Sequence, residues 1–302
     1  MTTFKDWVEG ARLRTLPAAI GPVILGAGAA LHLESFSLPR TTLALVTALA
    51  LQVGVNYSND YSDGVRGSDA DRVGPPRLTG GGLAKPSHVL FAALGCFALA
   101  GLSGLALIVV SHLWWLLLLG ILAVLAAWFY TGGKKPYGYA GIGLSELLVF
   151  IFFGLFATVG TTYVQAYSAP WWLWVAASGI GLASVTLLMV NNVRDMEGDA
   201  RVGKKTIAVR LGPRAARLSV PTMLGTSSIL AGIATLGTGN GPLWSVGVFL
   251  VTGLCAATVA APVMRGSTGG DLLPTLRNAG LYALAYGLVL GAVFAIGASG
   301  AL

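Results

Sequence analysis

The most constraining feature of the sequence is a stretch from residue 88 to residue 130 that contains no Asp, Glu, Lys or Arg. About 20 consecutive apolar residues are enough for one helix to cross a bilayer. The stretch is too long for one crossing, so we expect two crossings with a turn near Ser111 and His112. Because lipid offers no partners for loose backbone groups, each crossing segment is predicted to be an α-helix.

The composition of the whole chain agrees with a membrane location. Of 302 residues, 55% are hydrophobic and 10% are charged, and the mean hydropathy is +0.76. Soluble domains carry about 25% charged residues, so a water-soluble enzyme is excluded. We predict an all-α integral membrane protein that forms a single domain over residues 1–302. Nine membrane-spanning helices are expected: 16–33, 41–58, 88–110, 113–131, 144–164, 171–192, 218–238, 243–263 and 279–300.

The basic residues predict the orientation of these nine helices. If the N-terminus is cytoplasmic, 18 of the 19 Lys and Arg residues fall in cytoplasmic segments, and only Arg40 falls outside. Cytoplasmic loops are enriched in Lys and Arg, so we predict a cytoplasmic N-terminus. Most of the acidic residues lie on the same side, which predicts that the functional site faces the cytoplasm.

Two polar stripes stand at the cytoplasmic ends of the second and sixth predicted helices. Residues three, four and seven apart lie on one helical face. The first stripe, within 56–63, comprises Asn56, Asn59, Asp60 and Asp63, and the second, within 191–199, comprises Asn192, Asp195 and Asp199. The segments that carry the stripes start 135 residues apart (191 minus 56), so we predict two pseudo-repeated four-helix halves followed by a ninth helix.

The oxygen-only chemistry of these stripes favours a hard cation. Mg²⁺ is usually held by one or two carboxylates together with waters and substrate phosphates. We therefore predict that the two stripes face each other and hold Mg²⁺ ions, two in number, that bridge a diphosphate. Asn56, Asn59 and Asn192 are candidate ligands beside the four Asp residues. The loops that follow supply cations for phosphate, in segments 67–82, 130–135 and 203–206.

These motifs together resemble those of the UbiA superfamily of membrane prenyltransferases. The pattern of Asp60 with Asp63 and of Asp195 with Asp199 resembles the two Asp-rich motifs of that superfamily, and 130–135 resembles its basic loop. Segments 12–18, 59–64, 72–75, 130–133, 136–139, 191–195 and 203–212 look like the menaquinone branch. The third Asp of the ubiquinone branch's first motif falls here on Gly67, with Asp69 and Asp71 nearby, which weakens a 4-hydroxybenzoate assignment.

The resemblance implies a function and roles for individual residues. It implies transfer of a polyprenyl group from an allylic diphosphate to 1,4-dihydroxy-2-naphthoate, with loss of CO₂ and pyrophosphate, in a bacterial cytoplasmic membrane. Asp60, Asp63, Asp195 and Asp199 would be catalytic through Mg²⁺. The cations implied to bind the diphosphate are Lys134, Lys135, Lys205, Arg66 and Arg77. Arg14 is a candidate for the naphthoate carboxylate.

Three other functions fit parts of the pattern. The same fold could prenylate another ring, such as 4-hydroxybenzoate or homogentisate. An ion-coupled transporter could also carry membrane carboxylates, but transporters place them near the midplane, whereas here they cluster at one face. A phospholipid head-group transferase is disfavoured because residues 63–66 match its signature only in part.

Overall fold

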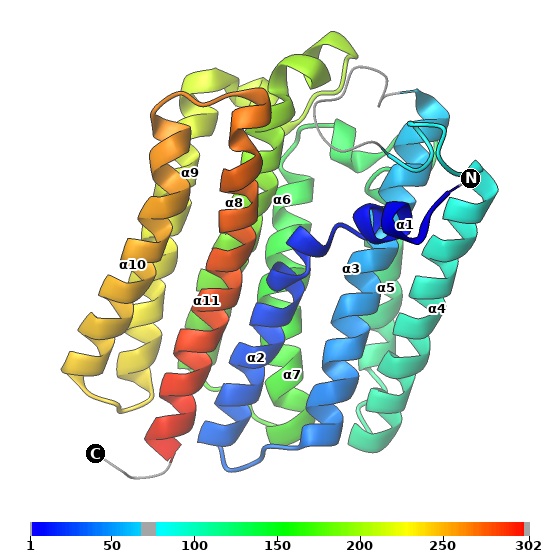
Figure 1. Cartoon of the computed structure of the whole chain (residues 1–302). Helices are drawn as coiled ribbons and strands as arrows, with labels where there is room; N and C mark the ends of the chain where they lie inside the picture. The colour runs from blue at the N-terminus through cyan, green and yellow to red at the C-terminus, as the bar shows by residue number, and fades with distance from the viewer. Residues whose placement is uncertain (1, 68–76, 299–302) are drawn as a thin grey trace.

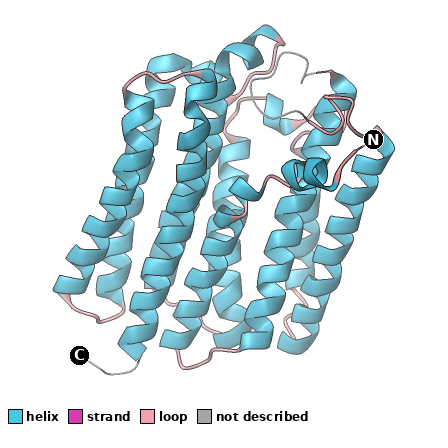
Figure 2. Cartoon of the chain, viewed as in Figure 1, coloured by secondary structure: helices cyan, strands magenta, loops and turns pink. Residues whose placement is uncertain are grey.

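A computed structural model of the chain describes residues 2–67 and 77–298. Those residues form a bundle of helices that run side by side, and no strand occurs among them (Figures 1 and 2). The predicted all-α class is therefore confirmed. Residues 68–76, which include Asp69, Asp71 and Arg72, lie outside the described part of the chain.

Eleven α-helices and four short helical turns follow one another along the described chain. The α-helices are α1 (Phe4–Gly10), α2 (Pro17–His32), α3 (Leu38–Arg66), α4 (Pro86–Ser111), α5 (Leu116–Phe129), α6 (Leu144–Val149), α7 (Ala157–Ala166), α8 (Trp171–Arg201), α9 (Ile207–Gly237), α10 (Pro242–Met264) and α11 (Leu273–Ala298). The short elements are η1 (Leu13–Thr15), η2 (Tyr137–Tyr139), η3 (Phe150–Phe156) and η4 (Gly269–Leu272), of which η3 is a π-helical segment that joins α6 to α7.

All nine predicted apolar segments fall on helices of this bundle. Seven helices of the described chain, with α6, η3 and α7 counted as one, are long and apolar enough to cross a membrane. An eighth candidate is the pair formed by residues 4–15 and α2, which is bent by 50°. The remaining segment, α5, has 14 residues and is shorter. The count of nine crossings and the arrangement in two halves stay predictions.

Helices α3 and α8 are both longer than their apolar cores. Each continues past the predicted span, so both polar stripes remain helical and end at the same end of the bundle (Figure 1). Helix α3 stops at Gly67, whose φ of 73° is a left-handed conformation that glycine adopts without steric cost. The opposite end of the bundle carries only short turns (Figure 1).

The core is most densely buried where α8, α9 and α11 meet. Ile180, Leu224 and Leu290 are at most 1% exposed there. Large apolar side chains on the outer surface, such as Phe91 and Leu243, are instead strongly exposed. An apolar exterior of this kind suits hydrocarbon chains rather than water.

Glycines bring the first long helix, α2, into close contact with the last, α11. A Cβ atom on Gly28 would overlap the Gly291 carbonyl oxygen, and a Cβ on Gly287 would overlap the Gly21 carbonyl oxygen. Small residues at such positions let two membrane helices pack backbone against backbone.

We expect Gly28→Ala to lower the free energy of unfolding by about 1–3 kcal/mol, as overpacking of a tight contact does. The matched control is Gly225→Ala on α9, where a Cβ would meet nothing within 4 Å, and there alanine should be neutral or slightly stabilising. Thermal unfolding of the purified protein in detergent measures both. Equal melting temperatures for the two variants would contradict the predicted contact.

Candidate functional site

A cavity of about 660 Å³ lies within the bundle. Helices α3, α5 and α8, the α6–α7 segment and the N-terminal residues Arg12 and Thr15 line it. Toward the N-terminal ends of α3 and α8 its walls are apolar. Toward their C-terminal ends it is lined by charged and amide side chains: Asn59, Asp63, Arg77, Asn191, Arg194, Asp195, Asp199 and Lys204.

The two acids of the first stripe have different surroundings. Asp60 is 1% exposed and does not line the cavity; its two carboxylate oxygens accept hydrogen bonds from the backbone N–H groups of Leu78 (2.9 Å) and Thr79 (2.8 Å). Asp63 does line the cavity, where its Oδ1 accepts a 2.5 Å hydrogen bond from Tyr139 Oη and its Oδ2 lies 3.8 Å from Arg77. Asp63 therefore faces the cavity, while Asp60 anchors the loop that carries Arg77.

We expect Asp60→Ala to destabilise the loop at 77–82. The change leaves two N–H groups without their acceptors in a buried place, which costs about 1–3 kcal/mol per buried group. Limited proteolysis and thermal unfolding should both report the loss. The control is Asp271→Ala, which removes an exposed acid of η4. A variant as resistant to protease as the control would show that Asp60 does not hold the loop.

The second stripe presents a paired and a partly unpaired carboxylate. Arg194 donates to both oxygens of Asp195 at 2.7 and 2.6 Å, and it also donates to Asn191 Oδ1 at 2.9 Å. Asp199 Oδ1 lies 3.5 Å from Lys204 Nζ. Asp199 Oδ2 is buried without a hydrogen-bond partner among the described residues. A buried anionic oxygen with no partner is costly, so this atom suits an additional cation.

Tyr139 lies between the first stripe and the loop that follows the second stripe. Its hydroxyl donates to Asp63, and Lys204 lies 4.9 Å above the centre of its ring. Arg66 also lies over the ring, at 5.7 Å, and donates to the backbone oxygens of Thr131 and Gly133. Cations are attracted to the faces of aromatic rings. The segment after α5 thus connects the end of α3 to the loop after α8.

The structure brings together about half of the residues that the sequence predicts for the site. Those that line the cavity are Asn56, Asn59, Asp63, Arg77, Asp195 and Asp199. Those that do not are Asp60, Asn192, Arg14, Arg66, Lys134, Lys135 and Lys205. The side chains of Lys134, Lys135 and Lys205 are exposed.

For several predicted residues that do not line the cavity, a residue close by in the sequence lines it instead. Lys204 lines the cavity where Lys205 was expected, Arg12 where Arg14 was expected, and Asn191 where Asn192 was expected. An α-helix turns about 100° per residue, so Asn191 lies about 40° from Asp195 and Asn192 about 60° on its other side. Of these two neighbours, Asn191 lines the cavity and Asn192 does not.

Arg194 and Tyr139 are the further site residues that the motif analysis missed. Arg194 is next to a motif acid, and its 7% exposure shows that it is paired inside the bundle rather than a lipid-facing anchor. Tyr139 stands within the segment 136–139, so its sequence context could have indicated it.

The donor set fits a hard cation that is completed by substrate. Among the described residues there is no cluster of three or more His, Cys, Asp or Glu side chains that could hold a metal alone. Asp63, Asp195 and Asp199 nevertheless line one cavity, and Asp199 offers an unpartnered buried oxygen. Mg²⁺ commonly takes few carboxylates and completes its shell with waters and phosphate oxygens.

Comparison with known proteins identifies a family of similar sequences. The model of the UbiA prenyltransferase family matches residues 19–270. A 1,4-dihydroxy-2-naphthoate octaprenyltransferase of Mycobacterium tuberculosis is 46% identical over 297 residues, covering 98% of this chain and 99% of the relative. The Escherichia coli protein of that name is 39% identical over 217 residues, 70% of each chain.

Solved structures share the fold. A UbiA homolog from Archaeoglobus fulgidus bound to GPP and Mg²⁺ has a TM-score of 0.68 and 16% identity, covering 95% of this chain and 99% of that one. A homolog from Aeropyrum pernix without ligand has a TM-score of 0.66 and 19% identity, covering 92% and 97%.

Proposed function

Because the chain belongs to the UbiA prenyltransferase family, we propose that its cavity joins a polyprenyl group to an aromatic ring at the membrane. The donor is an allylic polyprenyl diphosphate and the acceptor is 1,4-dihydroxy-2-naphthoate, the acceptor named for relatives up to 46% identical. The observation that carries the proposal is one cavity whose polar end bears acids and cations and whose other end is apolar.

The two ends of the cavity match the two parts of the donor. Lys204, Arg77 and Arg194 line the polar end and would attract the diphosphate. Phe152, Phe156 and other apolar side chains line the rest and would surround the prenyl tail. These walls also exclude water from the reacting carbon.

Asp63, Asp195 and Asp199 would hold the Mg²⁺ ions, for which we retain two as the proposed number. Bound Mg²⁺ would supply positive charge where the diphosphate develops negative charge as it leaves. The homolog solved with GPP and Mg²⁺ supports a divalent metal in this fold.

The chemistry then needs one bond broken and one formed on each substrate. The allylic C–O bond breaks and pyrophosphate leaves with the electron pair, while Arg77 and Lys204 stabilise its charge. The ring carbon that bears the carboxylate attacks the allylic carbon. The bond to the carboxylate breaks next, CO₂ leaves, and the electron pair returns to the ring, giving demethylmenaquinol. Since Arg12 lines the cavity and Arg14 does not, Arg12 replaces Arg14 as the partner for the acceptor carboxylate.

Nine crossings, a cytoplasmic N-terminus and a cytoplasmic site remain part of the proposal, in a bacterial plasma membrane. The loops after α3, α5 and α8 start at one end of the bundle (Figure 1), and their segments carry seven of the 18 basic residues that are predicted to be cytoplasmic. The orientation can be tested with two variants that each carry a single cysteine, one at Lys135 and one at Glu34, in a chain from which Cys96 and Cys255 have been removed. An impermeant maleimide added to intact cells should label the second variant only.

Turnover of three acceptors tests the activity directly. Membranes that contain the chain should prenylate 1,4-dihydroxy-2-naphthoate in preference to 4-hydroxybenzoate or homogentisate, with release of CO₂. Preference for another ring would contradict the acceptor. Ion flux in proteoliposomes without any prenyl transfer would instead favour the transporter.

The apolar end of the cavity should set how long a tail is accepted. Ala123 lines it from α5 and is 8% exposed. We expect Ala123→Trp to lower transfer from an octaprenyl diphosphate by about tenfold, as loss of about 1.4 kcal/mol of binding would, while geranyl diphosphate is used nearly as before. The control is Leu122→Trp, whose position on α5 is 45% exposed and outside the cavity lining. An equal loss with both donors would contradict the assignment of the tail.

A further inference from the structure

A chain of hydrogen bonds with fixed directions connects the N-terminal segment to α3. Backbone carbonyl oxygens only accept. Asn56 Nδ2 donates to the Ala11 oxygen at 2.9 Å, and Thr15 Oγ1 donates to the Arg12 oxygen at 2.9 Å. The orientation of the Asn56 amide and the direction of the Thr15 hydroxyl are therefore both determined by the backbone.

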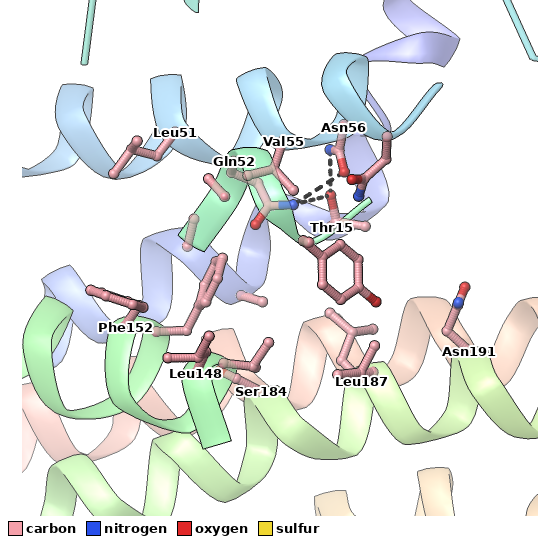
Figure 3. A pocket seen from close by; sticks show the side chains of 18 of the residues that line it. Thr15, Leu51, Gln52, Val55, Asn56, Leu148, Phe152, Ser184, Leu187 and Asn191 are labelled. Atoms are coloured by element: carbon pink, nitrogen blue, oxygen red, sulfur yellow. Dashed lines mark hydrogen bonds between the residues drawn. The ribbon is translucent and has the colours of Figure 1, made fainter. Parts of the chain in front are cut away.

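These two side chains in turn fix the amide of Gln52. Asn56 Oδ1 and Thr15 Oγ1 can only accept from it, and Gln52 Nε2 lies 3.4 and 3.1 Å from them. Gln52 must therefore turn its NH₂ toward them and its Oε1 away. Figure 3 shows that oxygen directed away from the dashed hydrogen bonds. Within the described chain Gln52 Oε1 has no hydrogen-bond partner, and the side chain is only 8% exposed.

The wall opposite this oxygen is mostly apolar. Gln52 lines the cavity, and Leu148, Phe152 and Leu187 face it from the opposite wall (Figure 3). Along α3, Gln52 lies about 10 Å before Asn59, at 1.5 Å per residue. The oxygen therefore stands between the charged end of the cavity and its apolar end. An acceptor on a cavity-lining side chain that has no partner within the described chain can take a donor from a bound ligand.

We propose that Gln52 Oε1 accepts a hydrogen bond from a ring hydroxyl of the aromatic acceptor, and that Thr15 and Asn56 are positioning residues that orient Gln52. This inference rests on the proposed function and names the acceptor subsite within it. Neither a prenyl tail nor a carboxylate can donate to Gln52 Oε1, so the contact distinguishes a phenolic ring from the other parts of both substrates. The bond leaves more electron density on the ring oxygen and so favours attack by the ring.

Steady-state kinetics of Gln52→Leu test the contact. We expect the KM for 1,4-dihydroxy-2-naphthoate to rise about tenfold, the equivalent of one lost hydrogen bond of about 1.4 kcal/mol. The KM for the prenyl diphosphate should change less than twofold. An unchanged KM for the acceptor, or an equal rise for both substrates, would overturn the proposal.

The acceptor itself provides a second test that does not depend on any variant. The two mono-O-methyl ethers of 1,4-dihydroxy-2-naphthoate each remove one donor. One of them should be used about tenfold less well than the other by the unmodified chain, and Gln52→Leu should abolish that difference. If both ethers match the parent compound in the unmodified chain, no ring hydroxyl is bound by Gln52.

The positioning role is tested by two changes at Thr15. Thr15→Ser keeps the hydroxyl and should retain the acceptor KM, whereas Thr15→Val should raise that KM alone. A serine variant as impaired as the valine variant would contradict the role of the hydroxyl. Failure of the proposed function is distinguishable from all of these results, because the unmodified chain would then not prenylate the naphthoate at all.

Discussion

Asp195→Asn is expected to slow prenyl transfer by about a hundredfold or more, with the protein still folded and inserted. Loss of one preorganised electrostatic contact at the site of developing charge typically costs that much. Asp195 lines the polar end of the cavity, and Arg194 holds its carboxylate in place with two hydrogen bonds. Asparagine keeps the size of the side chain and one oxygen for Arg194, so the change removes the charge rather than the packing.

The control for this variant is Asp271→Asn. Asp271 is an exposed acid of η4 that does not line the cavity, and its loss should leave turnover within about twofold, as for ordinary surface changes of up to 0.5 kcal/mol. The two variants carry the same change in net charge. Normal turnover by Asp195→Asn, with a melting temperature like that of the control, would exclude Asp195 from the site.

Removal of divalent metal is expected to abolish transfer altogether. Asp63, Asp195 and Asp199 bring several negative charges to one cavity, and without a cation they would repel a diphosphate. EDTA should therefore reduce both turnover and binding of the prenyl diphosphate, and excess Mg²⁺ should restore them.

Binding measurements without turnover sharpen the metal prediction. Titration of Mg²⁺ with a non-hydrolysable diphosphate analogue should give tight binding only when both are present, because the carboxylates alone do not complete a metal site among the described residues. Asp199→Asn should weaken this joint binding, since it changes the carboxylate with the unpartnered oxygen. Equal binding of the analogue with and without metal would contradict the magnesium assignment.

The helices could be predicted because their cause is local. Each of the nine apolar segments is long enough to require hydrogen bonds within itself, and each falls on a helix. The polar stripes of α3 and α8 could likewise be located, since a spacing of three, four and seven residues places side chains on one helical face whatever the fold.

What could not be predicted is which of two neighbours faces the cavity. Lys204 and Lys205 are adjacent lysines that the sequence does not distinguish. Only Lys204 lines the site, because the loop after α8 turns it toward Asp199. The position of Asp60 depends on contacts from Leu78 and Thr79, 18 and 19 residues away. Such choices depend on packing between segments that are distant in the sequence, and motif spacing does not record them.

The contact between α2 and α11 has a consequence for biogenesis. A ribosome delivers α2 to the membrane early and α11 last, with most of the protein made between them. Until α11 arrives, Gly21 and Gly28 of α2 lack the helix against which they pack, and the bundle can still rearrange around them. The bundle is therefore completed only at the end of synthesis. A chain shortened before residue 273 would leave the α11-binding surface of α2 uncovered, where quality-control proteases can recognise it.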